Sequence, residues 1–309
     1  MCIRDSLILY AMVVSQQHKK HVLVFNQNAL DLYSCFLLVI TYIVKLCNIH
    51  LSGTLGYYLC VIVVSECLIW AGMIGSVVNL AAVTVERYLK VVHAVWSRKK
   101  LRKWMIYSAG AFSWFGGFVY GLAIDFTTTA VTDGVCYQMS VWESPVAKLV
   151  HVIWYFASFY VGNLLMFIFC YWRILVVVRR QARVMAGHAA AGPGTSQTQS
   201  NQIQTNIIKT MIIICVFYAI TWMPMKLYFF LANFDYVSYS QDGYYTVLFI
   251  ALLYTCANPF IYAVKFDPVK SVLVGLIPYK KNTVEPVANV QIATPGVAAN
   301  AIRTAQARN

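Results

Sequence analysis

Charged residues are few in this 309-residue chain: Asp, Glu, Lys and Arg together make up 11% of the residues. Soluble globular domains carry about a quarter charged residues, so the composition excludes an ordinary soluble domain. The hydrophobic share is 60%. We therefore expect an all-α, polytopic membrane protein, because helices satisfy their own backbone hydrogen bonds inside a bilayer.

Six apolar runs are long enough to cross a bilayer as helices, which takes about 20 residues each. They lie near 29–47, 61–85, 104–124, 149–178, 207–233 and 244–264. A shorter apolar stretch, Leu7–Val14, precedes them and a polar, basic loop follows it. We interpret it as the inner end of a first helix, with residues 1–6 as a non-native start. The alternative is a real six-span protein.

Lysine and arginine are absent from every second loop. The loops at about 48–59, 125–147 and 234–243 contain neither residue, whereas the other loops and the C-terminal region are basic. This positive-inside pattern predicts a multi-pass plasma-membrane protein with a cytoplasmic C-terminus. The net charge of +13 is divided among short loops, so it predicts attraction to the anionic lipid bilayer and no nucleic-acid binding.

Most of the nine cysteines lie in predicted spans, where a thiol usually serves as a small packing residue. Cys60 and Cys136 instead lie on the predicted extracellular side, which is an oxidising compartment. We predict a disulfide between these two residues.

No internal repeat and no cluster of catalytic or metal-ligating residues is visible in the sequence, so we predict neither an enzyme nor a metal site. Transporters usually show matching halves; a membrane transporter remains the alternative from another class. We assign residues 7–277 to one bundle domain that ends in a short amphipathic helix at Asp267–Ile277. Residues 278–309 are predicted to form a disordered cytoplasmic tail.

Polar residues interrupt the apolar runs. A charge inside such a run destabilises the protein and is tolerated only when it has a partner or a function. Asp31 lies within the first run, and Glu86-Arg87-Tyr88 ends the second. Trp222-Met223-Pro224 lies in the fifth run, and Asn258-Pro259-Phe260-Ile261-Tyr262 closes the last. In order and spacing these groups resemble the rhodopsin-like (class A) G-protein-coupled receptors over nearly the whole chain.

The resemblance implies a seven-transmembrane helix bundle that binds an extracellular ligand and activates a heterotrimeric G protein by population shift. A neuropeptide is the leading ligand hypothesis, a lipid or other small molecule is the alternative, and arrestin is a further partner. The positions implied in activation are Glu86, Arg87, Tyr88, Val95, Tyr171, Trp222, Pro224, Asn258, Pro259 and Tyr262.

Several of these positions have specific roles in the resembled family. Arg87 would be held at rest by Glu86 and would meet Tyr171 in the active state, and Val95 would insert into the G protein. Pro224 would kink its helix, because proline removes one backbone hydrogen bond. Asn163, in the apolar run 149–178, stands where the family has a proline. The family's helix bulges at this point, and the missing proline leaves that bulge in doubt for this chain.

The resemblance also implies an allosteric sodium site and no other cofactor. Its ligands would be Asp31, Ser76, Thr255 and Asn258, because oxygen-only ligation suits a hard cation. The alternative is that Asp31 takes part in structural hydrogen bonds alone.

A helical stripe in the second run is predicted to face the ligand, although such a stripe also fits simple packing. It comprises Glu66, Ile69, Trp70 and Met73, with Trp222 added from the fifth run. Ile69 replaces the aspartate that anchors amines, and the last span has no lysine for retinal. The spacing from Cys60 to Arg87 is about two residues longer than the family's. Acidic outer loops indicate a basic peptide ligand.

Overall fold

The computed structural model describes residues 2–47, 49–138, 142, 144–188, 195–234, 236–238, 240–265 and 267–276. At many positions within 182–188, 195–211 and 256–276 it describes the backbone alone. Residues 2–276 form one compact unit. The predicted tail at 278–309 lies outside the described residues.

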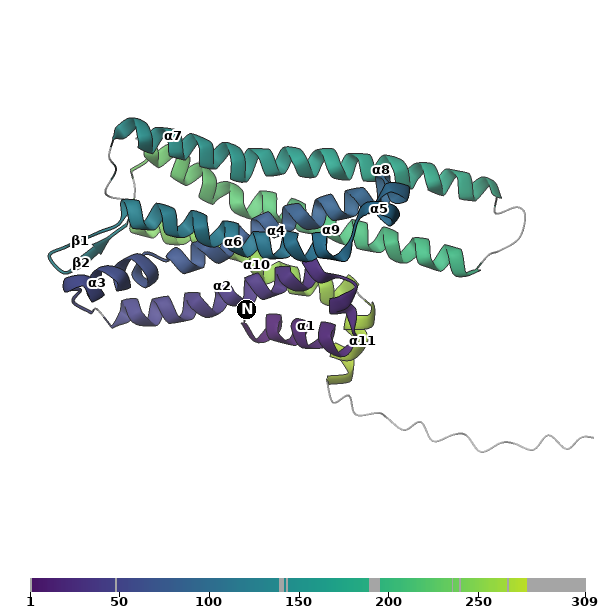
Figure 1. Ribbon diagram of the computed structural model, residues 1–309, viewed down its shortest axis with the longest axis horizontal. Coiled ribbons are helices and arrows are strands. Elements are labelled where there is room, and N and C mark those ends of the chain that lie inside the picture. The colour runs from purple at the N-terminus through teal and green to yellow at the C-terminus, as the bar shows by residue number, and fades with distance from the viewer. Residues whose placement is uncertain are drawn as a thin grey trace, which may run out of the picture. The chain divides into compact units, whose positions relative to one another are not determined.

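Long helices running side by side make up this unit (Figure 1). They are α1 (Cys2–Val14), α2 (Val22–Leu46), α3 (Gly53–Leu59), α4 (Cys67–Val92), α5 (Ala94–Lys100), α6 (Lys103–Thr128), α7 (Pro145–Phe156), α8 (Asn163–His188), α9 (Thr195–Asn233), α10 (Gln241–Lys265) and α11 (Asp267–Leu276). A short 3-10 turn at Gln17–Lys19 joins α1 to α2. Two π-helical segments, Cys60–Val64 and Ala157–Gly162, connect α3 to α4 and α7 to α8.

All six predicted spans are helical, and α1 begins at Cys2 rather than at Leu7. Among the described residues, four helical segments are both long and apolar enough to cross a membrane: Val22–Leu46, Gly53–Val92, Pro145–Gln181 and Ile212–Asn233. α6 has 26 residues, about 39 Å of helix, but its glycines and serines lower its hydropathy.

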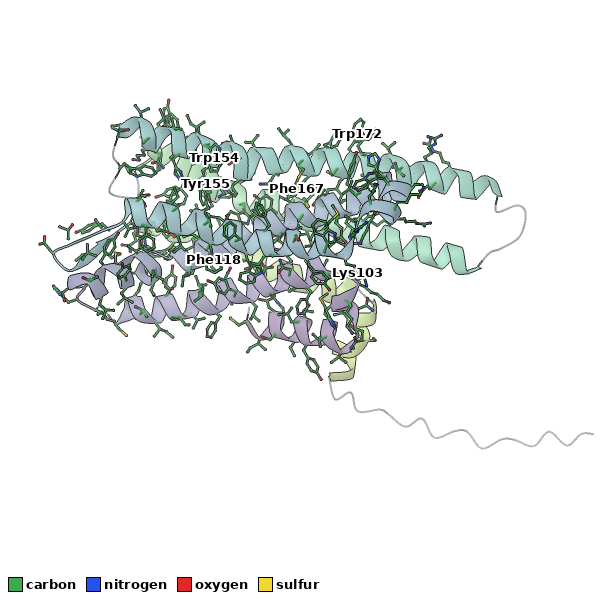
Figure 2. All side chains as sticks on the ribbon, in the orientation of Figure 1. Lys103, Phe118, Trp154, Tyr155, Phe167 and Trp172 are labelled. Carbon is green, nitrogen blue, oxygen red and sulfur yellow. A yellow bond between two sulfur atoms is a disulfide. The ribbon has the colours of Figure 1, made fainter. Side chains whose placement is uncertain are left out.

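Large apolar side chains also cover the outside of the bundle. Phe115 on α6 and Ile168 on α8 are each 66% exposed, and Trp172 is 61% exposed (Figure 2). Such a surface is unfavourable in water and is suited to lipid tails.

The centre of the bundle is α4, which packs against α2, α6 and α8. Small residues allow its backbone to approach α6 closely. A Cβ atom on Gly117 would lie 2.2 Å from the Ala71 carbonyl oxygen and 2.9 Å from the Gly75 nitrogen. This is the small-residue packing typical of helices in membranes.

A hairpin at one end of the bundle carries Cys136. Its strands β1 (Ala130–Thr132) and β2 (Val135–Tyr137) pair antiparallel around Asp133 and Gly134, which both have positive φ, as a tight hairpin turn requires. The predicted disulfide between Cys60 and Cys136 is confirmed. It joins the π-helical segment before α4 to this hairpin.

The segment between Cys60 and α4 is irregular. Residues Cys60–Val64 form a π-helix, and Glu66 adopts a left-handed conformation with φ of 65°. A π turn is a common local irregularity in a helix, and a longer spacing between Cys60 and Arg87 would fit there. From Cys67 onward α4 continues as a regular helix.

The helix formed by the apolar run 149–178 bulges although Asn163 replaces the family's proline. The π-helix Ala157–Gly162 ends directly before Asn163, whose amide nitrogen donates to the carbonyl oxygens of Ser158 (3.2 Å) and Phe159 (3.1 Å). The Tyr218 hydroxyl also donates to Phe159 (2.8 Å). Side chains thus satisfy carbonyls that the bulge leaves open, so the doubt that the missing proline raised was wrong.

The predicted amphipathic helix is confirmed as α11. Val269 is buried, and Val272 and Leu273 pack against the core, whereas Ser271 and Gly275 are exposed. α11 contacts α1 and α10 within the same unit.

Candidate functional site

Arg87 lies near the C-terminal end of α4 and contacts the start of α2. Its Nη2 is 3.1 Å from Nδ1 of His21, the residue that precedes α2. A guanidinium can only donate, so this nitrogen of His21 is the acceptor and is unprotonated. Burial, followed by the positive charges of Arg87, Lys90 and Lys20, lowers the pKa of His21 to about 3.

Glu86 does not hold Arg87, contrary to the prediction. Its carboxylate pairs instead with the Lys90 ammonium at 2.5 Å, one helical turn along α4. The physical reason is that residues four apart share one face of a helix, whereas Arg87 projects toward α2. Arg87 Nε is buried without a hydrogen-bond partner among the described atoms.

Tyr171 contacts α4 one turn before Arg87. This buried residue of α8 places its hydroxyl 3.3 Å from Thr84 Oγ1, one turn before Arg87 on α4. Tyr88 points elsewhere, with its hydroxyl 3.3 Å from His93 Nε2. Val95 is 72% exposed on α5, which places it at the surface, where a partner can reach it.

Trp222 lies deep in the bundle above an aromatic layer. It is 2% exposed, and its ring centroid lies 5.9 Å from that of Tyr218. Tyr218 in turn contacts Phe167 and Tyr254 edge to face. Pro224 lies inside α9, where one backbone hydrogen bond is lost.

The C-terminal half of α10 continues the helix through Asn258, Pro259 and Tyr262. The side chains of these three predicted site residues lie outside the described residues. Thr255 is buried, and its hydroxyl donates to the Leu252 carbonyl at 2.8 Å.

Asp31 is buried on α2 and accepts hydrogen bonds from two neighbours. Ser76 Oγ donates to Asp31 Oδ1 at 2.9 Å, and Gln27 Nε2 lies 3.5 Å from the same oxygen. Gln27 Nε2 also donates to Ser76 Oγ. The amide group of Gln27 therefore lies against two of the oxygens predicted to bind sodium.

A chain of amide groups extends this network across three helices. Asn79 on α4 donates to Gln27 Oε1 at 2.8 Å, Asn26 donates to Asn79 Oδ1 at 2.9 Å, and Trp114 on α6 donates to Asn26 Oδ1 at 2.9 Å. Sequence reasoning missed these residues. The available signal was three consecutive amide residues, Asn26 to Asn28, directly before the apolar run that contains Asp31, since polar groups in a membrane span need partners.

The side-chain oxygens of Asp31 and Ser76 fit a sodium ion under one condition. The Asp31 carboxylate and Ser76 hydroxyl are hard oxygen ligands, but the Gln27 amide would have to turn away from them. No group of three or more His, Cys, Asp or Glu in the described part of the chain could hold a metal ion.

Glu66 joins three helices instead of facing a ligand. Its carboxylate pairs with Lys45 of α2 at 2.5 Å and accepts from the Tyr244 hydroxyl of α10 at 2.5 Å. The side chain is 1% exposed. These two partners satisfy the charge, so Glu66 is not an acidic group of the open mouth.

A cavity of about 280 Å³ lies at the end of the bundle that carries the hairpin. Of the five predicted pocket residues only Trp70 lines it, whereas Ile69, Met73 and Trp222 are buried in the core. The other walls come mainly from α6, α7 and α9, including Tyr120, His151, Tyr155, Lys226, Phe229 and Phe230. Figure 2 labels Tyr155 on α7.

Comparison with known proteins shows what the chain is similar to. The model of the family described as 7 transmembrane receptor (rhodopsin family) matches residues 5–262. The chain is 27% identical over 199 residues to the substance-K receptor of Bos taurus, covering 62% of this chain and 50% of that receptor. It thus spans about half the length of this curated relative. The crystal structure of squid rhodopsin is similar, with a TM-score of 0.71 at 16% identity, covering 90% of this chain and 81% of that one.

Proposed function

The chain belongs to the 7 transmembrane receptor (rhodopsin) family, and from this membership we propose that it binds an extracellular ligand and activates a heterotrimeric G protein. The family consists of multi-pass membrane receptors rather than enzymes or transporters. One arrangement carries the proposal: the cavity at Trp70 and the Glu86-Arg87-Tyr88 motif lie near opposite ends of α4. The separation along the helix is about 25 Å.

The basic end of the bundle is the side proposed to face the cytoplasm. α5 ends in Arg98, Lys99 and Lys100, next to the exposed Val95. A disulfide marks the opposite end as the oxidising side. The G protein, and arrestin after it, would bind at the α5 end, with the C-terminus on the same side.

A peptide is the proposed class of ligand. The bovine relative is the substance-K receptor, and this similarity supports a peptide; the hairpin beside the cavity offers a polar edge for one. The cavity volume favours a second candidate, because about 280 Å³ is at the small end of ligand pockets. A lipid or other small molecule would fill it, whereas a peptide would insert only one end.

The proposed switch runs through α9. Pro224 weakens the helix locally, and Trp222 rests on Tyr218 directly below the cavity. A ligand that favours another packing of Trp222 shifts α9 against α4 and α8. Arg87 then leaves His21 and becomes available to the G protein, which is a population shift between two packings.

Sodium is proposed as a regulator of the same switch. The ion would bind Asp31 and Ser76 in competition with the Gln27 amide, with Thr255 and Asn258 as further predicted ligands. Holding α2 to α4 in this way would favour the resting arrangement.

The test of the proposed function is a screen of synthetic peptides on cells that express the chain, with second-messenger signals as the readout. We expect at least one peptide to produce a signal that cells without the chain do not give. A receptor present at the cell surface that answers no peptide but answers small carboxylates or lipids would support the second candidate. Surface expression without any agonist-dependent signal would contradict the function.

A further inference from the structure

Lys226 is a buried cation at the wall of the cavity. It lies on α9, two residues after Pro224, and is 4% exposed. Its ammonium donates to the Tyr155 hydroxyl and lies 3.8 Å from the Tyr155 ring centroid and 4.8 Å from the Trp222 ring centroid. Among the described residues, no carboxylate forms an ion pair with it.

A buried ammonium group lowers the stability of the folded protein. An ionisable side chain within a membrane span is destabilising unless it has a partner or a function. Cation–π contacts and one phenol offset only part of the cost of removing an ammonium from water. The position therefore calls for an anion that the described residues do not supply.

The other charges described around the cavity do not supply this anion. Asp125 lines the cavity but forms no ion pair with Lys226 among the described residues, and Glu66 is paired with Lys45. Lys148 lines the cavity as well. Two ammonium groups thus stand against one carboxylate in the described lining, which favours a negatively charged ligand group.

Flat apolar walls stand on either side of Lys226. The rings of Tyr120 and Tyr155 stack at 5.8 Å with 14° between their planes, and His151 stacks on Tyr155 at 6.1 Å. On another wall Phe156 and Phe230 lie 4.9 Å apart. These surfaces suit an aromatic or branched apolar group next to the anion.

We propose that this cavity binds a carboxylate of the ligand, with Lys226 as its counter-ion and an aromatic or apolar group of the ligand against the Tyr120–Tyr155 wall. The inference rests on the proposed receptor function and refines its ligand class. It replaces the basic ligand that the outer-loop acids indicated. The carboxylate is either a free peptide C-terminus or an acidic side chain.

The geometry also connects binding to the switch. Lys226 contacts the ring of Trp222, which lies one turn earlier on α9. A carboxylate in the cavity draws the ammonium away from the faces of Tyr155 and Trp222, because an ion pair is stronger than a cation–π contact in a site with little water. Trp222 then loses a contact that holds it in place.

Three probes test the proposal by binding to the purified receptor in lipid nanodiscs: N-acetyl-phenylalanine, its amide, and N-acetyl-aspartyl-phenylalanine amide. Thermal-shift titration should show the free acid binding about tenfold tighter than the amide. Lys226→Met and Lys226→Gln should remove this difference. Lys103→Met, at an exposed site on α6, should keep it.

The third probe distinguishes the two carboxylate sources. Tighter binding of the aspartyl compound than of the simple amide assigns the site to an acidic side chain, and binding of the free acid alone assigns it to a C-terminus. Binding of both carboxylate probes no tighter than that of the simple amide, or binding of none of the three, overturns the proposal. These readouts need no G protein, so they stand or fall separately from the signalling screen.

The receptor without ligand provides a second readout. Lys226→Met removes an uncompensated charge, so we expect its melting temperature to rise above that of the wild type. A clear fall would mean that the ammonium has a structural partner, and this would also count against a ligand counter-ion.

Discussion

Arg87 is held by a hydrogen bond to His21 and not by an ion pair with Glu86, its neighbour in the sequence. The His21 acceptor is neutral, so it holds the guanidinium by a hydrogen bond without the added attraction of a carboxylate. Meanwhile Glu86 is occupied by Lys90. The resting contact is therefore weaker than an ion pair, and it depends on the protonation of one imidazole.

Acid should destabilise this contact. Because the fold lowers the pKa of His21 from 6.5 to about 3, it favours the neutral ring. The stability from this group is present above pH 6.5 and is lost as the pH falls from 6.5 toward 3. We expect the melting temperature to drop between pH 7 and pH 5 in the wild type, and to drop less in His21→Asn, which cannot titrate.

The control for this comparison is His18→Asn in the same loop, which should keep the wild-type response. An equal drop in all three proteins would assign the acid sensitivity to other groups and would remove His21 from the account.

Gln27 should set the strength of the sodium effect. Its amide lies against the Asp31 and Ser76 oxygens, so Gln27→Leu frees them for the ion. We expect sodium to stabilise Gln27→Leu against heat more than the wild type, and to have no effect on Asp31→Asn. Potassium at equal ionic strength is the control for general salt effects. Sodium stabilisation that is unchanged in Asp31→Asn would exclude the site.

At the scale of elements, the contact between α4 and α6 depends on glycines. Gly117 has no room for a side chain, whereas nothing lies within 4 Å of a Cβ atom on its neighbour Gly116. Gly117→Val should destabilise the protein by at least about 1–3 kcal/mol, the usual cost of overpacking. Gly116→Val should be close to neutral. Melting temperatures of the two variants in detergent provide the measurement, and equal values would contradict this packing.

Helices and their order follow from the sequence, whereas their irregularities do not. Apolar runs of bilayer length and the alternation of basic loops predict the spans, because both reflect the surrounding lipid and water. The π-helices before α4 and α8 leave no such trace. The π turn at Cys60–Val64 and the Asn163 side chain change local hydrogen bonding without changing hydropathy.

At the scale of the whole molecule, the predicted pocket was only partly right, since Trp70 lines the cavity but Ile69, Met73 and Trp222 lie in the core. The stripe at Ile69 and Met73 lies in the core, because a π turn and a left-handed Glu66 precede α4 and set the direction in which its side chains point. The actual cavity is bounded mainly by α6, α7 and α9. Lys226 was visible in the sequence as a cation in an apolar run, but only the fold shows that it lines a cavity.

We propose that this chain transmits ligand binding to a G protein through Arg87. The most direct measurement is nucleotide exchange on a purified heterotrimeric G protein, with the receptor in lipid vesicles and a pooled peptide library as the stimulus. We expect peptide-dependent exchange by the wild type and by Arg173→Ala, which removes the same charge from an exposed position on α8. We expect loss of most of this exchange in Arg87→Ala at equal receptor density. Full exchange by Arg87→Ala, or none by the wild type, would contradict the account.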